Sequence, residues 1–226
     1  MSSDEKQNAR NYFFSTSRLP GVIGCVDGIH IGIVAPIELR HQYLNRKGYY
    51  SLNAMIACDH NMCIRYVDAR YPGSTHDSFV WNCSNLKSVL ETWYQRGERS
   101  MFLGDAAGYP LSSCLLTPFR NVSSGSRQSL FNKQHAKGRN IIERTIGVLK
   151  SRFRCLLNER KMHYAPSKAK QIVNACCALH NICIKYRVTD PEIVEEEISL
   201  PTEGIQLETP SSAEAERRRN QIMESL

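Results

Sequence analysis

The sequence predicts an α/β fold in which helices flank a mixed β-sheet. Two observations carry this prediction: apolar, β-branched segments occur early in the chain, and long segments with helical spacing of apolar residues occur late. With 42% hydrophobic and 23% charged residues, the 226-residue chain has the composition of a globular protein with a sizeable core. Its length favours one domain with tails.

Five apolar segments have the length and composition of β-strands: residues 21–34, 49–58, 62–69, 100–104 and 115–119. The first is interrupted by a single acid, Asp27, which indicates a buried strand that carries a functional carboxylate. Asp59-His60-Asn61 has the chemistry of a turn, so the second and third segments predict an antiparallel hairpin. Pro118 would confine the last strand to an edge or an end of the sheet.

Three segments have apolar residues at helical spacing: residues 78–94, 139–157 and 167–186. The first is preceded by Ser74-Thr75-His76-Asp77, which has the composition of an N-terminal helix cap, and the third follows Pro166. The second helix is expected to be amphipathic. Its polar face is predicted to hold Arg139, Glu143, Gly147, Lys150 and Arg154.

The charge of the chain is divided along its length. The whole sequence carries a net charge of +7 and has a pI near 9.0, which favours a polyanionic partner. Residues 120–170 hold thirteen Lys and Arg against two acids, whereas residues 190–226 hold ten acids against three Arg. These contrasts predict a lead-in over residues 1–20, a domain over residues 21–188 that binds a polyanion, and an acidic tail over residues 189–226 that is disordered or forms a short docking helix.

The nine cysteines show no paired Cys-x-x-Cys spacing. Cys58 with Cys63, and the group from Cys176 to Cys183, could suggest zinc sites, but the second group lies along an apolar helical stripe. We therefore interpret the cysteines as core residues. No apolar run approaches the roughly 20 residues that a membrane-spanning helix needs, so no membrane is expected as a partner.

Three acids fall at informative places in this order of elements. Asp27 lies in the first strand, Asp105 directly follows the strand at 100–104, and Glu143 lies on the amphipathic helix. Taken singly, Asp27 could be a buried acid satisfied by backbone donors and Glu143 a solvated helix residue. Carboxylates from separate elements can, however, hold two divalent cations about 3.5–4 Å apart, which activate a nucleophile and stabilise the leaving oxygen of a phosphodiester. Magnesium suits such a sparse set because it prefers oxygen ligands and keeps positions for water and phosphate.

Five ordered motifs run between residues 21 and 186: Val26-Asp27-Gly28-Ile29-His30, Tyr71-Pro72-Gly73-Ser74-Thr75-His76-Asp77, Gly104-Asp105-Ala106-Ala107-Gly108-Tyr109-Pro110-Leu111, Leu115-Leu116-Thr117-Pro118, and Arg139-Asn140-Ile141-Ile142-Glu143-Arg144 leading to Leu149-Lys150. Together they resemble the PIF/Harbinger transposases and the nuclease-like proteins derived from them. The resemblance implies an RNase H-like fold and a catalytic Asp-Asp-Glu set. That set maps onto Asp27, Asp105 and Glu143, with magnesium or manganese as the metal and DNA as the substrate.

The last motif also resembles the Arg, Glu, Lys pattern of bacterial insertion-sequence transposases, here Arg139, Glu143 and Lys150. Basic residues of this helix would then approach phosphates beside the metal, while the missing side chain of Gly147 leaves room for substrate. The candidates for DNA contact are Arg139, Arg144, Lys150, Arg152 and Arg154.

His76 and Asp77 have two interpretations. They could serve only as the cap of the helix that follows, which needs no function. Alternatively, Asp77 is a candidate for a further metal ligand, and His76 for a supporting role at the site. His30, three residues after Asp27, is expected to pack.

The resemblance leaves a rival hypothesis from a different class. Relatives usually have a helical region ahead of the catalytic domain, whereas about twenty residues precede the first strand here. The chain could therefore be a DNA-binding module with little activity that works through a protein partner. By resemblance, the expected partner is a Myb-like DNA-binding protein and the expected location is the nucleus, with the cytoplasm second. Arg217-Arg218-Arg219 is the native candidate for an import signal.

Overall fold

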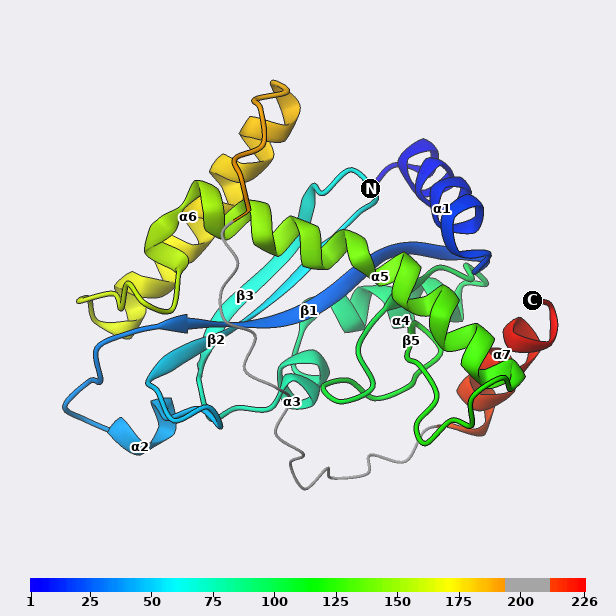
Figure 1. The fold of residues 1–226 in the computed structure, drawn as a ribbon, viewed down its shortest axis with the longest axis horizontal. Helices are drawn as coiled ribbons and strands as arrows, with labels where there is room; N and C mark the ends of the chain where they lie inside the picture. The colour runs from blue at the N-terminus through cyan, green and yellow to red at the C-terminus, as the bar shows by residue number, and fades with distance from the viewer. Residues whose placement is uncertain (194–211) are drawn as a thin grey trace.

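The computed structural model describes residues 1–193 and 212–226, and these contain a mixed five-stranded sheet in the order β3-β2-β1-β4-β5 (Figure 1). The first three strands pair in an antiparallel manner, whereas β4 pairs parallel to β1 and β5 parallel to β4. The strands are β1 Val22–Gly32, β2 Ser51–Cys58, β3 Ile64–Pro72, β4 Met101–Leu103 and β5 Leu115–Leu116. Each lies within or overlaps one of the five apolar segments, so the predicted mixed sheet flanked by helices is confirmed.

The helices differ from the prediction mainly at their ends. The expected single helix over 78–94 is two helices, because Ser84 caps the second with a side chain that accepts a hydrogen bond from the Lys87 N–H. The amphipathic helix begins twelve residues earlier than expected and ends at Arg152, so Arg154 lies outside it. The helices are α1 Ser3–Ser17, α2 Arg40–Tyr43, α3 Asp77–Asn82, α4 Asn85–Gln95, α5 Arg127–Arg152, the 3₁₀ turn η1 Arg154–Leu156, α6 Pro166–Lys185 and α7 Ala213–Glu224.

Two hydrophobic clusters lie against the sheet. The larger joins β1 and β2 to α1, α5 and α6, and Phe13, Ile31 and Phe131 are among its fully buried members. The smaller joins β1 and β4 to α3 and α4 around Trp81 and Phe102. Helix α5 passes across β1 towards α7 (Figure 1), and it contacts both β1 and β4.

The last described segment, residues 212–226, forms a helix, which agrees with the second alternative for the acidic tail, a short docking helix. Helix α7 buries Ala215 and Ile222 and lies beside the N-terminal half of α5 (Figure 1). Arg218 of the presumed import signal donates to the backbone oxygen of Arg99 at 2.6 Å, which ties the helix to the core. The expected disorder of the rest of the tail falls on residues 194–211, which lie outside the described residues.

The cysteines lie mostly in the interior, as expected of core residues. Five of the nine are buried, namely Cys25, Cys58, Cys114, Cys176 and Cys177, and all nine are free thiols. Within residues 1–193 and 212–226, no helix is long and apolar enough to cross a bilayer.

His135 on α5 supplies a stability prediction. Its side chain is buried, and Nε2 lies 3.0 Å from the backbone oxygen of Leu116, to which it donates. Burial lowers the pKa of His135 to about 4. Because the unfolded chain still binds a proton near pH 6.5, His135 should lower the free energy of unfolding progressively as the pH falls from about 6.5 to 4, by about 3 kcal/mol in total.

A Gln at this position can donate to the same carbonyl but does not titrate. Thermal unfolding of His135→Gln should therefore show a flatter pH dependence than the parent between pH 4 and 6.5. Parallel curves for the two proteins would show that His135 contributes nothing to the acid sensitivity of the fold.

Candidate functional site

The first two predicted acids lie at matching places on neighbouring parallel strands. Cys25 of β1 pairs with Leu103 of β4 in parallel. An aspartate lies two residues after each of them, Asp27 after Cys25 and Asp105 after Leu103. Neighbouring strands are separated by about 4.8 Å, so this register places the two carboxylates side by side at the same level of the sheet. Gly104, the residue between β4 and Asp105, still donates from its backbone N–H to the Leu116 oxygen of β5 at 3.0 Å, so the sheet holds the chain up to Asp105.

Asp77, at the start of α3, is the third carboxylate of this group. The backbone leaves room for it at two glycines, since a Cβ at Gly28 would lie 2.6 Å from the Asp77 Cγ and a Cβ at Gly108 would lie 2.9 Å from its Oδ2. Asn53 on β2 holds Asp77 in place by donating from Nδ2 to Oδ1 at 2.7 Å and to the Thr75 backbone oxygen at 2.8 Å. We call Asp27, Asp77 and Asp105 the acid cluster.

The electrostatics show that the members of the acid cluster repel one another. The pKa of Asp27 is raised to about 7, first by burial and then by the neighbouring charges of Asp77 and Asp105, while Arg139 opposes the rise. The pKa of Asp77 is also raised, first by burial, against the hydrogen bond from Asn53. The cluster therefore forms a site of high negative potential that a cation would relieve.

Arg139 of α5 is the cation nearest to Asp27. Its Nη2 donates to Asp27 Oδ2 at 2.6 Å, and its Nη1 lies 3.3 Å from Glu143 Oε1, one turn further along the same helix. The Arg139 side chain is only 15% exposed, and its guanidinium lies between the two acids. The positive charge of Arg139 thus balances the negative charge of Asp27 in this structure.

Glu143 is linked to Asp27 of the acid cluster through the guanidinium of Arg139. Its side chain is 59% exposed and its ion-pair partner is Arg139. In the parts of the chain that the structure describes, no group of three His, Cys, Asp or Glu side chains has an arrangement that could hold a metal ion. Carboxylate oxygens nevertheless suit magnesium or manganese chemically, because these ions need few protein ligands. The donor types fit, although Asp27 and Glu143 are both bound to Arg139 in this structure.

The other predicted DNA-contact residues lie on or after the C-terminal part of α5. Arg144 is 58% exposed and pairs with Asp190 at 3.3 Å. Arg152 is nearly buried, with 7% of its side chain exposed, and pairs with the same Asp190 at 2.8 Å, so it cannot reach a phosphate unless this pair breaks. Arg154 is exposed on η1, and Lys150 is half-buried. DNA contact by these residues stays a prediction.

The two supporting residues also have contacts within the chain. A Cβ at Gly147 would lie 3.2 Å from Ile193 Cγ2, so the space beside this glycine is next to a residue of the chain itself. His76 occupies the cap position of α3 but makes no side-chain cap hydrogen bond, because its ring contacts the guanidinium of Arg46 instead. Asp77 likewise turns inward to Asn53. The capping interpretation therefore does not describe what these side chains do.

Gly28 and Gly108, which we call the glycine cradle, border the Asp77 carboxyl, and this close approach can be tested. Gly28→Ala should destabilise the protein by about 1–3 kcal/mol, because the new methyl group overlaps the Asp77 carboxyl, which Asn53 holds in place. In an Asp77→Ala background the overlap is gone, so the same substitution should cost much less. Chemical denaturation of the four proteins of this double-mutant cycle measures the coupling. If Gly28→Ala lowered the free energy of unfolding equally in both backgrounds, Asp77 would not be in contact with Gly28.

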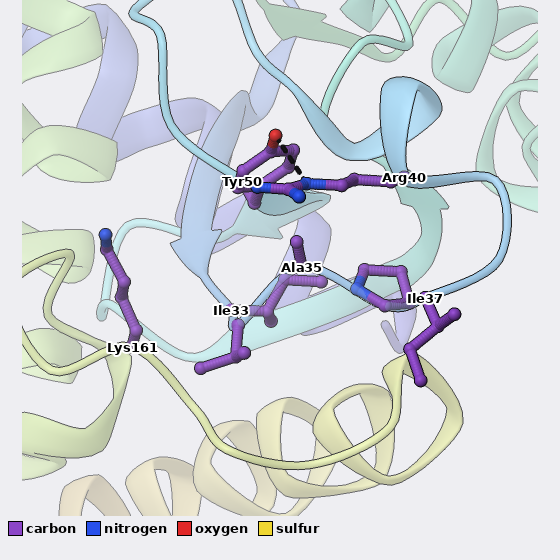
Figure 2. A pocket seen from close by; sticks show the side chains of 8 residues that line it. Ile33, Ala35, Ile37, Arg40, Tyr50 and Lys161 are labelled. Carbon is purple, nitrogen blue, oxygen red and sulfur yellow. Dashed lines mark hydrogen bonds between the residues drawn. The ribbon is translucent and has the colours of Figure 1, made fainter.

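A separate cleft of about 580 Å³ opens just beyond β1 (Figure 2). Its lining is mainly apolar, and Arg40 bridges to the Tyr50 hydroxyl at 2.7 Å. Ile33 on its wall is six residues beyond Asp27, which corresponds to about 20 Å along an extended strand. The cleft is therefore not part of the acid cluster. It is lined by Ile33, Val34, Ala35, Pro36, Ile37, Arg40, Tyr50 and Lys161.

Sequence reasoning missed two residues of the site. Asn53 is an amide in a fully buried strand that is otherwise apolar after its first residue, Ser51, and a polar side chain in an apolar strand is also the signal that singled out Asp27. Arg46 lies in the segment before β2 and gives no comparable signal, because its approach to His76 depends on tertiary structure.

Comparison with known proteins gives one family and several relatives. The model of the family described as "DDE superfamily endonuclease" matches residues 26–181. The protein named "Putative nuclease HARBI1" is similar in Rattus norvegicus, with 35% identity over 96% of this chain and 62% of the relative. The protein of the same name in Mus musculus is 37% identical over 80% of this chain and 51% of the relative.

A plant protein is more distant. "Protein ALP1-like" of Arabidopsis thaliana is 28% identical over 77% of this chain and 46% of its own length. The chain thus spans between about half and three fifths of the length of these relatives. No solved structure matches it.

Proposed function

Since the chain belongs to the DDE superfamily endonuclease family, we propose that it is a divalent-metal-dependent nuclease that cleaves DNA phosphodiester bonds. Asp27, Asp105 and Glu143 would be its catalytic residues. The observation that carries the proposal is the parallel register of β1 and β4, which brings Asp27 and Asp105 to one level beside α5.

Magnesium or manganese would be held by Asp27 and Asp105, with Glu143 joining from α5 and Asp77 as a further ligand. When bound, the metal supplies Lewis acidity and lowers the pKa of a water molecule. Arg139, once released from Asp27 and Glu143, lies on the face of α5 that meets the cluster and can bind a phosphate. The pKa of Asp27 is raised to about 7 when no metal is bound. A bound cation would favour the ionised carboxylate that ligation requires, so metal binding at Asp27 should release a proton near neutral pH.

DNA would be bound largely through its backbone by the basic residues of α5 and its neighbours. Sequence specificity would come from a Myb-like partner in the nucleus, since contacts to backbone phosphates carry no sequence information directly. The isolated chain should accordingly bind DNA with little sequence preference.

A second candidate function is a DNA-binding module with little activity. The ion pairs of Arg139 with Asp27 and Glu143 favour it, since they satisfy these acids without metal. Incubation of supercoiled plasmid with the protein in magnesium, manganese, calcium or chelator separates the two. The nuclease proposal expects nicked plasmid with magnesium or manganese alone, and binding without nicking under every condition would favour the module.

A further inference from the structure

A rigid turn beside the acid cluster presents two cations to solvent. Asn45, which is buried, builds this turn: its Oδ1 accepts from the backbone N–H groups of Lys47 at 3.0 Å and Tyr49 at 3.2 Å. Gly48 closes the turn with a φ of +79° and donates from its backbone N–H to the Asn45 carbonyl at 3.0 Å. The side chains of Arg46 and Lys47 are exposed at its tip. We call residues 45–49 the cationic turn.

Hydrogen bonds fasten the cationic turn to β1 and β2. Asn45 Nδ2 donates to Ser51 Oγ at 2.9 Å, and the same oxygen lies 3.0 Å from Nδ1 of His30. His30 follows Asp27 by three residues on β1. Burial, followed by the charges of Lys47, Lys150 and Arg46, lowers the pKa of His30 to about 4, so this histidine is neutral at pH 7 and these three cations gather around it.

The cationic turn also reaches the loop that carries Asp77. Gly73 donates from its backbone N–H to the Ser51 carbonyl at 2.8 Å, and Arg46 contacts the ring of His76, the residue before Asp77. Because His76 directly precedes Asp77, this contact places the Arg46 guanidinium next to the start of α3, where Asp77 lies. The turn is therefore a fixed positive border of the acid cluster.

Such a border fits the phosphates of a nucleic-acid strand. Phosphates close to three carboxylates are repelled unless cations stand beside them, and backbone phosphates recur at a spacing that lets several be bound at once. Arg46 offers a planar fork for phosphate oxygens, and Lys47 offers a mobile point charge. Residues 45–51 contain no acid that would oppose such binding.

We propose that Arg46 and Lys47 bind the phosphates of the DNA strand that lies across the acid cluster, so that the cationic turn positions the strand from the β2 side while α5 contacts it from the other. The proposal rests on the proposed nuclease function for its substrate, and it adds positioning residues that come from outside the basic segment 120–170.

The test measures binding without cleavage. The affinity of a labelled DNA duplex for the full chain is measured in calcium at several salt concentrations, for the parent and for Arg46→Gln combined with Lys47→Gln. The variant should bind all sequences more weakly and show a slope of log affinity against log salt that is smaller by up to about 2 × 0.9. Both side chains are exposed, and Asn45, which holds the turn, is unchanged, so thermal unfolding should show that the variant folds as the parent does.

The matched control removes two exposed cations at the far end of the molecule, Lys185 and Arg187, where α6 ends well away from α2 in Figure 1. Lys185→Gln combined with Arg187→Gln should keep the parental slope. An unchanged slope in the Arg46 and Lys47 variant overturns the proposal, as does equal loss in both variants. If the parent binds DNA but never nicks it, while the turn variant still loses slope, the nuclease proposal fails and the phosphate contacts stand.

Discussion

Replacing Asp105 with Asn is expected to slow metal-dependent nicking of plasmid DNA by about a hundred-fold or more, the scale seen when one electrostatic group is removed from a catalytic site. Asn nearly preserves the shape of the side chain, but it offers a single neutral oxygen in place of a carboxylate. The charge that would balance the metal beside Asp27 is then lost, and the register of β1 and β4 stays intact.

The same variant should respond less to metal in the absence of DNA. A ligand that binds only the folded protein raises its melting temperature according to its occupancy, so manganese should stabilise Asp105→Asn much less than the parent. Asp68→Asn is the matched control, since Asp68 is a buried aspartate on β3 that pairs with Arg70 at 2.6 Å, outside the acid cluster. That control should lose stability but keep both nicking and the manganese response. Parental nicking by Asp105→Asn would remove Asp105 from the site.

Replacing Arg139 with Met is expected to destabilise the metal-free protein by about 2 kcal/mol at pH 8, because a partly buried carboxylate loses its partner. The loss should be smaller at pH 5. Since the pKa of folded Asp27 is about 7, this carboxyl is protonated at pH 5 and has little ion pair to lose, whereas at pH 8 it is ionised.

Manganese should raise the melting temperature of Arg139→Met more than that of the parent, because the metal no longer competes with the guanidinium for Asp27. Arg144→Met is the matched control on α5: its ion pair with Asp190 is 3.3 Å long and exposed, so its loss should matter little at either pH. A manganese shift in Arg139→Met that equals the parental one would show that Arg139 and the metal occupy different places.

Strands and acids could be predicted from the sequence because their signals are local. Apolar runs, the first of them rich in β-branched residues, marked all five strands. Five ordered motifs indicated the PIF/Harbinger type of family, which the comparisons confirm. Helix ends could not be predicted as well. The first half of α5 buries Phe131, His135 and Gly138, of which only the first counts as apolar in a periodicity argument.

For a related reason, helix α1 was not predicted, and α7 was expected only as an alternative to disorder. Helix α1 buries only Ala9, Phe13 and Ser17, which lie four residues apart and include one large apolar side chain. Helix α7 buries Ala215 and Ile222 within an otherwise charged segment. Both helices are stabilised by contacts with the core, so their own sequences carry little of the signal.

The acid cluster was predictable only in part. Asp27 and Asp105 follow from strand order, but the cradle of Asp77 depends on glycines and an amide from three separate segments. The ion pair of Arg139 with Glu143 follows from helical spacing, whereas its bond to Asp27 joins residues 112 positions apart.

The most direct test of the proposed triad is the initial rate of plasmid nicking by Glu143→Gln at saturating manganese, because Glu143 is the one member that stands outside the acid cluster. Glu91→Gln is the matched control, since Glu91 is also an exposed helical glutamate with an i,i+4 partner, Lys87 at 3.7 Å. If Glu143 joins Asp27 and Asp105 around the metal, its replacement should lower the rate by about a hundred-fold or more, and the control should nick as the parent does. Parental nicking by Glu143→Gln would contradict the Asp-Asp-Glu assignment.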